Sequence, residues 1–280
     1  MACLALACRG DELASAQERC ADLPRAPVVF VHGSGLTSAT WREMTDHFVS
    51  SGYPRDYLVT VDLIPRDGDN VAAARGPIAK AVQNALRNRD QYLASRGCAG
   101  RTFEPRKADL VAHSMGAISA RWFANFVSPE SVRTVVSIAG ANHGTNRLCR
   151  RTGAGDKQMC PAFADSQTQS KVQVLLNGTS DSSIDETPYG PGEDGPGVSS
   201  VPPSDRAHIV YFSIRLEPDE WIVPAASALL DGAGNGDKSP LEAAAFTQSS
   251  PGNFLFTGSI SHDELPSHPA LVDFVLQLLR

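Results

Sequence analysis

The segment AHSMG at residues 112–116 is the first candidate for chemistry in this sequence, because it sets a serine between small residues at the end of an apolar stretch. A chain that passes from a strand directly into a helix makes a cramped turn, which small residues two positions before and two positions after the serine can accommodate. Ala112 and Gly116 occupy those positions, so Ser114 is predicted to be an exposed nucleophile at the tip of the turn. The usual pattern is G-x-S-x-G, and here Ala112 replaces its first glycine. The alternative is a serine that only caps the helix predicted over residues 115–126.

A serine hydroxyl is a weak nucleophile at neutral pH and needs a histidine as general base, which a carboxylate orients. In folds with this strand–serine–helix turn, the chain order is serine, acid, histidine. His262 follows the last predicted strand within GSISHDEL, where its loop can reach Ser114. His268 is the alternative base, although its place between Ser267 and Pro269 favours a capping or packing role.

The acid is expected in the loop after the strand predicted over residues 208–214, because sheets of this kind assemble their sites at the carboxyl ends of the strands. Asp219 is our candidate, since it follows a proline in the turn and precedes the apolar segment WIVP, which would shield it from water. Glu217 and Glu220 are the competing carboxylates, and each is equally compatible with a solvated position in the loop.

A hydroxyl that attacks a carbonyl group produces an oxyanion, which prepositioned donors must stabilise. One donor is typically the amide after the nucleophile, and the other comes from the first strand-to-helix loop. These would be the backbone N–H groups of Met115 and Ser34. Gly33 and Gly35 flank Ser34 and keep that loop slim enough for a substrate to approach the backbone.

The elements that must position these residues alternate between strand and helix along most of the chain. β-Branched and apolar runs predict strands, and apolar residues at helical spacing predict helices. This alternation predicts an α/β fold with a mostly parallel sheet and helices on both faces. The predicted strands are residues 27–31, 57–63, 109–112, 132–138, 208–214 and 253–257, and the predicted helices are residues 40–53, 76–96, 115–126 and 270–279.

The composition is that of a folded protein, since 280 residues with 42% hydrophobic and 20% charged side chains suffice for a sizeable core. The 25 basic residues are scattered and the formal net charge is -6, which argues against a nucleic-acid partner. No apolar run reaches the ~20 residues that a transmembrane helix needs. The histidines and cysteines lack the spacing of metal ligands, so neither a metal nor another cofactor is expected.

We expect one α/β domain over residues 26–280, preceded by an N-terminal segment at residues 1–25. That segment begins MACLALACRG, which is similar to the end of a secretory or lipoprotein signal, so lipid anchoring through an N-terminal cysteine is an alternative to free secretion. Residues 177–205 are rich in Gly, Pro, Ser and acidic residues and predict a long surface loop. Its carboxylates leave two interpretations open, a Ca²⁺ site and a flexible solvated loop.

Six cysteines without a C-x-x-C pair favour an exported protein with disulfides. Cys149 and Cys160 bracket a polar loop that contains glycine, and a bridge between them would stabilise the fold by roughly 2–4 kcal/mol. We predict that bridge. Cys20 and Cys98 form a second candidate pair, and free buried thiols are the alternative for both pairs.

Five motifs carry a resemblance to a known family: VVFVHGSG, DLVAHSMG, VVSIAGANHGT, FSIRLEPDEWIV and GSISHDEL. Together they resemble the secreted bacterial class 2 lipases of the α/β-hydrolase superfamily, including Bacillus and actinobacterial members, over about residues 28–279. The resemblance implies a bridged loop after NHGT, where Cys149 and Cys160 lie. It also implies site residues at these positions: Ser114 as nucleophile, Asp219 as acid, His262 as base, and Ser34 and Met115 as amide donors. Residues 177–205 and 236–252 look longer than in the smallest members, which leaves the preferred acyl chain open.

These residues predict a secreted serine carboxylic-ester hydrolase, a lipase or esterase, that works through an acyl-enzyme. Its partner would be a small-molecule or lipid ester, with contact to a lipid interface. The same three side chains would equally serve an acyltransferase or a depolymerase of polyesters such as polyhydroxyalkanoate. A non-catalytic binding module is a further interpretation, which the complete set of residue types disfavours.

Overall fold

The computed structural model describes residue 20 and residues 26–98, 106–161, 169–178, 208–230, 233–236 and 244–280. The candidate N-terminal signal and the acidic residues considered for Ca²⁺ lie outside the described residues.

Seven strands of the described chain form one sheet in the order β2-β1-β3-β4-β5-β7-β6. Neighbouring strands pair in parallel, except that β6 pairs antiparallel with β7. The strands are β1 (Val28–Val31), β2 (Leu58–Val61), β3 (Ala108–His113), β4 (Val132–Ile138), β5 (Val210–Arg215), β6 (Phe246–Ser250) and β7 (Asn253–Phe256). The predicted α/β architecture with a mostly parallel sheet is confirmed.

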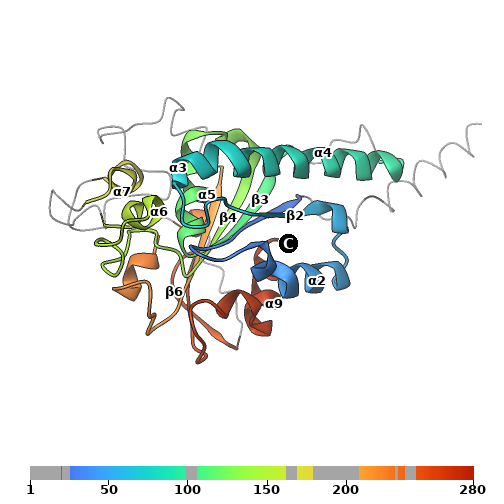
Figure 1. Cartoon of the computed structure of the whole chain (residues 1–280). Helices are drawn as coiled ribbons and strands as arrows, with labels where there is room; N and C mark the ends of the chain where they lie inside the picture. Colours follow the sequence, from blue (N-terminus) through green and yellow to red (C-terminus); the bar gives the residue numbers. More distant parts are fainter. Residues whose placement is uncertain are drawn as a thin grey trace, which may run out of the picture.

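Helices cover both faces of the sheet, with α3, α4 and α5 on one side and α2 and α9 on the other (Figure 1). The helices are α2 (Arg42–Ser50), α3 (Asn70–Ala73), α4 (Ala79–Ser95), α5 (Met115–Phe126), α6 (Ala154–Gln158), α7 (Lys171–Asn177) and α9 (Pro269–Leu278). Short helical turns are η1 (Ser38–Trp41), η2 (Arg55–Tyr57), η3 (Ala74–Ile78), η4 (Pro129–Ser131), η5 (Ala225–Ala228), η6 (Ala233–Gly236) and η7 (Leu265–Ser267).

The central strands are mostly apolar, as expected for strands whose two faces are both buried. In β1, Val29 and Val31 pack in the core under α4 and α5, whereas Val28 and Phe30 pack in the core under α2 and α9. This division follows from the two-residue period of a strand, which sends successive side chains to opposite faces. The sheet is thus held rigidly between two cores.

Two local features differ from the predicted elements. The helix predicted over residues 76–96 begins earlier, because α3, η3 and α4 follow one another without a break from Asn70 to Ser95. Pro77 lies inside η3, which is a π-helical turn, and such a wider turn accommodates a residue that lacks a backbone N–H group. Strand β6 was not predicted, because its sequence FTQSS is mostly polar and only Phe246 is buried.

Both candidate cysteine pairs are joined in the structure, Cys149 with Cys160 and Cys20 with Cys98. The prediction of the first bridge is confirmed, and the second, left open by the sequence, is present. None of the helices in the described ranges combines the length and the apolar character that crossing a bilayer requires.

Candidate active site

Ser114 lies between the last residue of β3 and the first residue of α5, with φ 54° and ψ -124°. Positive φ is strained for a residue with a side chain and is found mostly where function requires it. The turn is crowded: a Cβ atom on Gly116 would lie 2.5 Å from the carbonyl oxygen of His32, and one on Gly33 would lie 2.8 Å from Cβ of Ser114. Both positions therefore require glycine, and the serine is held at the sheet edge.

His262 and Asp219 meet at the same edge of the sheet. Nδ1 of His262 lies 3.0 Å from each carboxylate oxygen of Asp219, and the two residues are only 1% and 7% exposed. Oδ1 of Asp219 also accepts hydrogen bonds from the backbone amides of Trp221 at 2.8 Å and Ile222 at 2.9 Å. The carboxylate is thus fixed by its own loop and in turn fixes the imidazole.

Ser114 and His262 line one pocket, but no hydrogen bond joins their side chains. Nε2 of His262 is buried and has no hydrogen-bond partner among the described residues, whereas Nδ1 is taken up by Asp219. In enzymes without bound substrate such a nucleophile–base contact is often long and tightens only when substrate binds. The arrangement leaves Nε2 available to a proton from the pocket.

The competing residues make other contacts. Glu217 pairs with Arg215, and Glu220 accepts a hydrogen bond at 2.7 Å from the backbone amide of His262 rather than from its ring. His268 caps α9 by accepting from the amide of Ala270 at 3.2 Å. None of these three candidates forms a hydrogen bond or ion pair with the ring of His262, and none lines the pocket with Ser114.

The two candidate amide donors are Met115, which follows Ser114 directly, and Ser34, which lines the same pocket. Met115 begins α5, so its N–H is one of the first four in the helix, which have no acceptor within the helix itself. Ser34 lines the pocket in the loop after β1, and that loop turns at Gly35 with φ 75°. The hydroxyl of Ser34 donates to Asp156 at 3.4 Å, which joins this loop to α6.

His32 holds the loop before Ser34 through both ring nitrogens. Its Nδ1 donates to the carbonyl of Gly33 at 2.8 Å, and its Nε2 accepts from the amide of Leu63 at 2.9 Å. These contacts require the neutral ring. Burial lowers the pKa of His32, which favours that neutral form.

His113 is a buried residue whose contact to the site was not predicted from the sequence. Its Nε2 donates to the backbone carbonyl of His262 at 3.0 Å, and the two rings lie 4.6 Å apart. Burial holds the pKa of His113 well below its ordinary value, and the neighbouring His262 acts in the same direction. A neutral His113 therefore anchors the backbone of His262 without adding charge.

The pocket at this edge has a volume of about 150 Å³. Its lining residues are Ser34, Gly35, Ser114, Leu148, Arg151, Asp156, Met159, Trp221, Ile222, His262 and Asp263. Four of them belong to the segment from Leu148 to Cys160, which we call the bridged loop because the Cys149–Cys160 disulfide closes it. Within the described ranges, no three His, Cys, Asp or Glu side chains gather closely enough to hold a metal ion.

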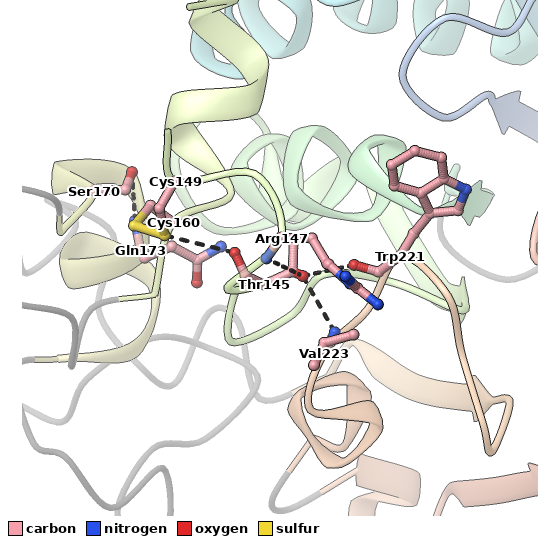
Figure 2. Close-up of a disulfide and its surroundings, with 8 residues drawn as sticks. All are labelled: Thr145, Arg147, Cys149, Cys160, Ser170, Gln173, Trp221 and Val223. Carbon is pink, nitrogen blue, oxygen red and sulfur yellow. Dashed lines mark hydrogen bonds between the residues drawn. A yellow bond between two sulfur atoms is a disulfide. The ribbon is translucent and has the colours of Figure 1, made fainter. Parts of the chain in front are cut away.

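Thr145 joins the bridged loop to the loop that carries Asp219 (Figure 2). Its hydroxyl donates to the carbonyl of Trp221 at 2.6 Å and accepts from the amide of Val223 at 3.1 Å. Its own amide donates to the carbonyl of Met159 at 2.6 Å. One buried threonine thus ties a wall of the pocket to the segment that fixes the carboxylate.

A positive-φ serine between a parallel strand and a helix, with a carboxylate-bound histidine at the same sheet edge, is the arrangement found in α/β hydrolases. The chain belongs to the alpha/beta hydrolase family, whose model matches residues 28–273.

The structure is similar to that of Bacillus licheniformis lipase BlEst2 in its mature form, with a TM-score of 0.53 and 19% identity over 92% of this chain and 93% of that one. The propeptide form of the same lipase gives a TM-score of 0.54 and 18% identity over 91% of this chain, which spans 50% of the length of that form. At these identities the likeness shows a common fold. No curated protein matches the chain.

Proposed function

We propose that this member of the α/β-hydrolase family is a secreted serine carboxylic-ester hydrolase, a lipase or esterase. Ser114 attacks the ester carbonyl while His262 takes the hydroxyl proton at Nε2 and passes it to the leaving alcohol. The acyl group stays on Ser114 as an ester. His262 then activates a water molecule, which releases the acid and regenerates the serine.

The observation that carries the proposal is the state of His262. Asp219 binds Nδ1 at 3.0 Å, so the ring carries its proton there and presents a basic Nε2 to the pocket shared with Ser114. A buried carboxylate at this distance also stabilises the imidazolium that forms during attack. A general base needs such an unpartnered nitrogen at the pocket that holds the nucleophile.

The amides of Ser34 and Met115 would stabilise the tetrahedral oxyanion. The helix α5 adds its N-terminal dipole, which favours negative charge at that end. Losing one such donor typically costs ~10²–10³ in turnover.

The two disulfides support an oxidising compartment outside the cytosol. The substrate is a small-molecule or lipid ester, and the exposed Trp221 at the pocket is the side chain best placed to contact a lipid surface.

The test is turnover of a nitrophenyl acyl ester by the wild-type protein and by Ser114→Ala. We expect the substitution to reduce kcat on the order of 10⁶-fold, because the covalent step is lost. Ser119→Ala is the matched control: Ser119 is a buried serine of α5 that bonds Asn70 and does not line the pocket. Equal turnover by wild type and Ser114→Ala would refute the proposal.

A further inference from the structure

We propose that the pocket selects esters of short-chain acids, up to about six carbons, and that Leu148, Met159 and Arg151 of the bridged loop set this limit. The inference rests on the proposed function and specifies its substrate class. It is carried by the size of the pocket, by the chemistry of its walls and by the way the bridged loop is held.

The pocket is small for an acyl site. Its volume of about 150 Å³ compares with roughly 300–1,000 Å³ for ordinary ligand pockets. An apolar cavity of roughly this volume is known to hold benzene, a six-carbon ring. A chain of about six carbons therefore fills the space beside Ser114.

Large apolar side chains and one buried carboxylate form part of the pocket wall. Leu148, Met159 and Ile222 are 6%, 1% and 1% exposed and give an acyl chain its apolar contacts. Asp156 is 5% exposed and bounds the same pocket, where its carboxylate bonds the hydroxyl of Ser34. Methylene groups pressed against it would remove water from a charge without replacing the lost hydrogen bonds, which is unfavourable. A long chain cannot extend in that direction.

The outer rim is charged and offers little apolar surface. The Arg151 guanidinium lies over the Trp221 ring, 5.6 Å from its centre, and 3.8 Å from the carboxylate of Asp156, so it links the two loops across the rim. Asp263 adds a second exposed charge there. Among the described residues, the only large hydrophobic side chains that are exposed are Trp221 and Ile64, and Ile64 does not line this pocket. A chain that left the pocket would therefore find the Trp221 ring as its single large apolar contact among the described residues and would otherwise enter water.

The wall is also fixed in place. The disulfide closes the bridged loop, and Met159 at its end accepts a hydrogen bond from the amide of Thr145. Thr145 in turn bonds the backbone on the far side of the pocket at Trp221 and Val223 (Figure 2). Because these ties join the two walls, the pocket cannot widen by moving the loop outward.

The experiment measures kcat/KM for a series of nitrophenyl esters from acetate to decanoate, each below its solubility limit. For the wild type we expect the highest value at four to six carbons and a value at least ~10-fold lower at ten, since even one methylene that does not fit costs ~10-fold or more. Leu148→Ala removes an apolar side chain from the pocket wall, and Arg151→Ala opens the rim. Each variant should raise the ratio of decanoate to butyrate hydrolysis at least ~10-fold.

Arg150→Ala is the matched control, because Arg150 is an exposed neighbour that does not line the pocket, and its chain-length profile should equal that of the wild type. If Leu148→Ala fails to give a cooperative unfolding transition, the chain-length profile of Arg151→Ala, a substitution at an exposed residue, tests the inference. A wild-type optimum at eight carbons or more, or unchanged profiles in folded variants of both positions, overturns the inference while leaving the hydrolase proposal intact. Absence of hydrolysis for every ester overturns the proposed function itself.

Discussion

The two nitrogen atoms of His262 lie in different environments, and this difference defines the chemistry at the residue scale. Nδ1 is bound to a buried carboxylate, and Nε2 lies free beside the pocket. His113 adds a third constraint by holding the backbone carbonyl of the same residue. The imidazole is thereby oriented before any substrate arrives, which would spare the proposed reaction the cost of ordering it.

Replacing Asp219 by Asn tests the role of the carboxylate. The amide keeps the shape but cannot stabilise an imidazolium or favour the required tautomer, so we expect kcat for an ester to fall ~10⁴-fold. Glu220→Gln serves as the control, because its side-chain oxygen can still accept from the backbone amide of His262. Steady-state kinetics measure kcat for both variants. A larger loss of kcat in Glu220→Gln than in Asp219→Asn would show that Glu220, and not Asp219, is the acid.

Several residues of the candidate site follow from sequence alone and others do not. Ser114 is predicted because the strand–turn–helix transition restricts which residues can flank it, and His262 and Asp219 follow from chain order. Asp156 and His113 were not predicted as parts of the site, because their roles depend on contacts between segments distant in the chain, such as the 149 positions between His113 and His262.

At the scale of elements, the bridged loop and the Asp219 loop act as one unit. Thr145 is fully buried, and its hydroxyl bonds two backbone groups of the second loop while its amide bonds the first. Displacing that second loop would shift Asp219, and hence His262, from its position.

We expect Thr145→Val to lower kcat by up to ~10²-fold with a smaller change in KM, since a displacement of about 1 Å at a reacting group has a cost of that size. Thr145→Ser should retain activity, because it keeps the hydroxyl. Kinetics with a butyrate ester measure both parameters.

Ser170→Ala is the matched control for stability. Ser170 caps α7 through its hydroxyl and does not contact the Asp219 loop, so its loss should reduce stability by about 0.5–2 kcal/mol and leave kcat unchanged. Were Thr145→Val and Ser170→Ala to have the same kcat, Thr145 would be a purely structural residue.

The predictability of elements depended on their length and burial. The buried strands β1, β3, β4 and the helix α5 follow from apolar runs and helical periodicity. Helix α6 was not predictable, because its five residues are too few to establish a helical period. Strand β6 was not predictable, because most of its residues are exposed. The disulfide at residues 149 and 160 was predictable from the polar loop between the cysteines. The sequence did not indicate that this loop lines the pocket.

At the scale of the whole molecule, the sheet divides the interior into two cores, and stability depends in part on keeping two buried histidines neutral. His113 and His32 have pKa values lowered by burial, whereas an unfolded chain would titrate them near 6.5. Below pH 6.5 the unfolded state therefore binds protons that the folded state does not, and the free energy of unfolding falls as the pH falls.

His113→Gln isolates this contribution, because glutamine offers a neutral donor that does not titrate. We expect the variant to be less stable than the wild type at pH 7.5, and the difference in the free energy of unfolding to narrow as the pH falls below 6.5, because burial lowers the pKa of His113 only in the folded wild type. Urea unfolding at a series of pH values measures the gap. Parallel stability curves would show that His113 is protonated equally in both states.

The central claim is that one serine forms a covalent acyl-type intermediate, and the most direct measurement is peptide mapping by mass spectrometry after reaction with a fluorophosphonate, which reacts with activated serines. The account predicts a single phosphonylated peptide modified at Ser114, with labelling abolished in Ser114→Ala and strongly slowed in His262→Ala. Labelling at a different residue, or no labelling of the folded wild-type protein, would contradict it.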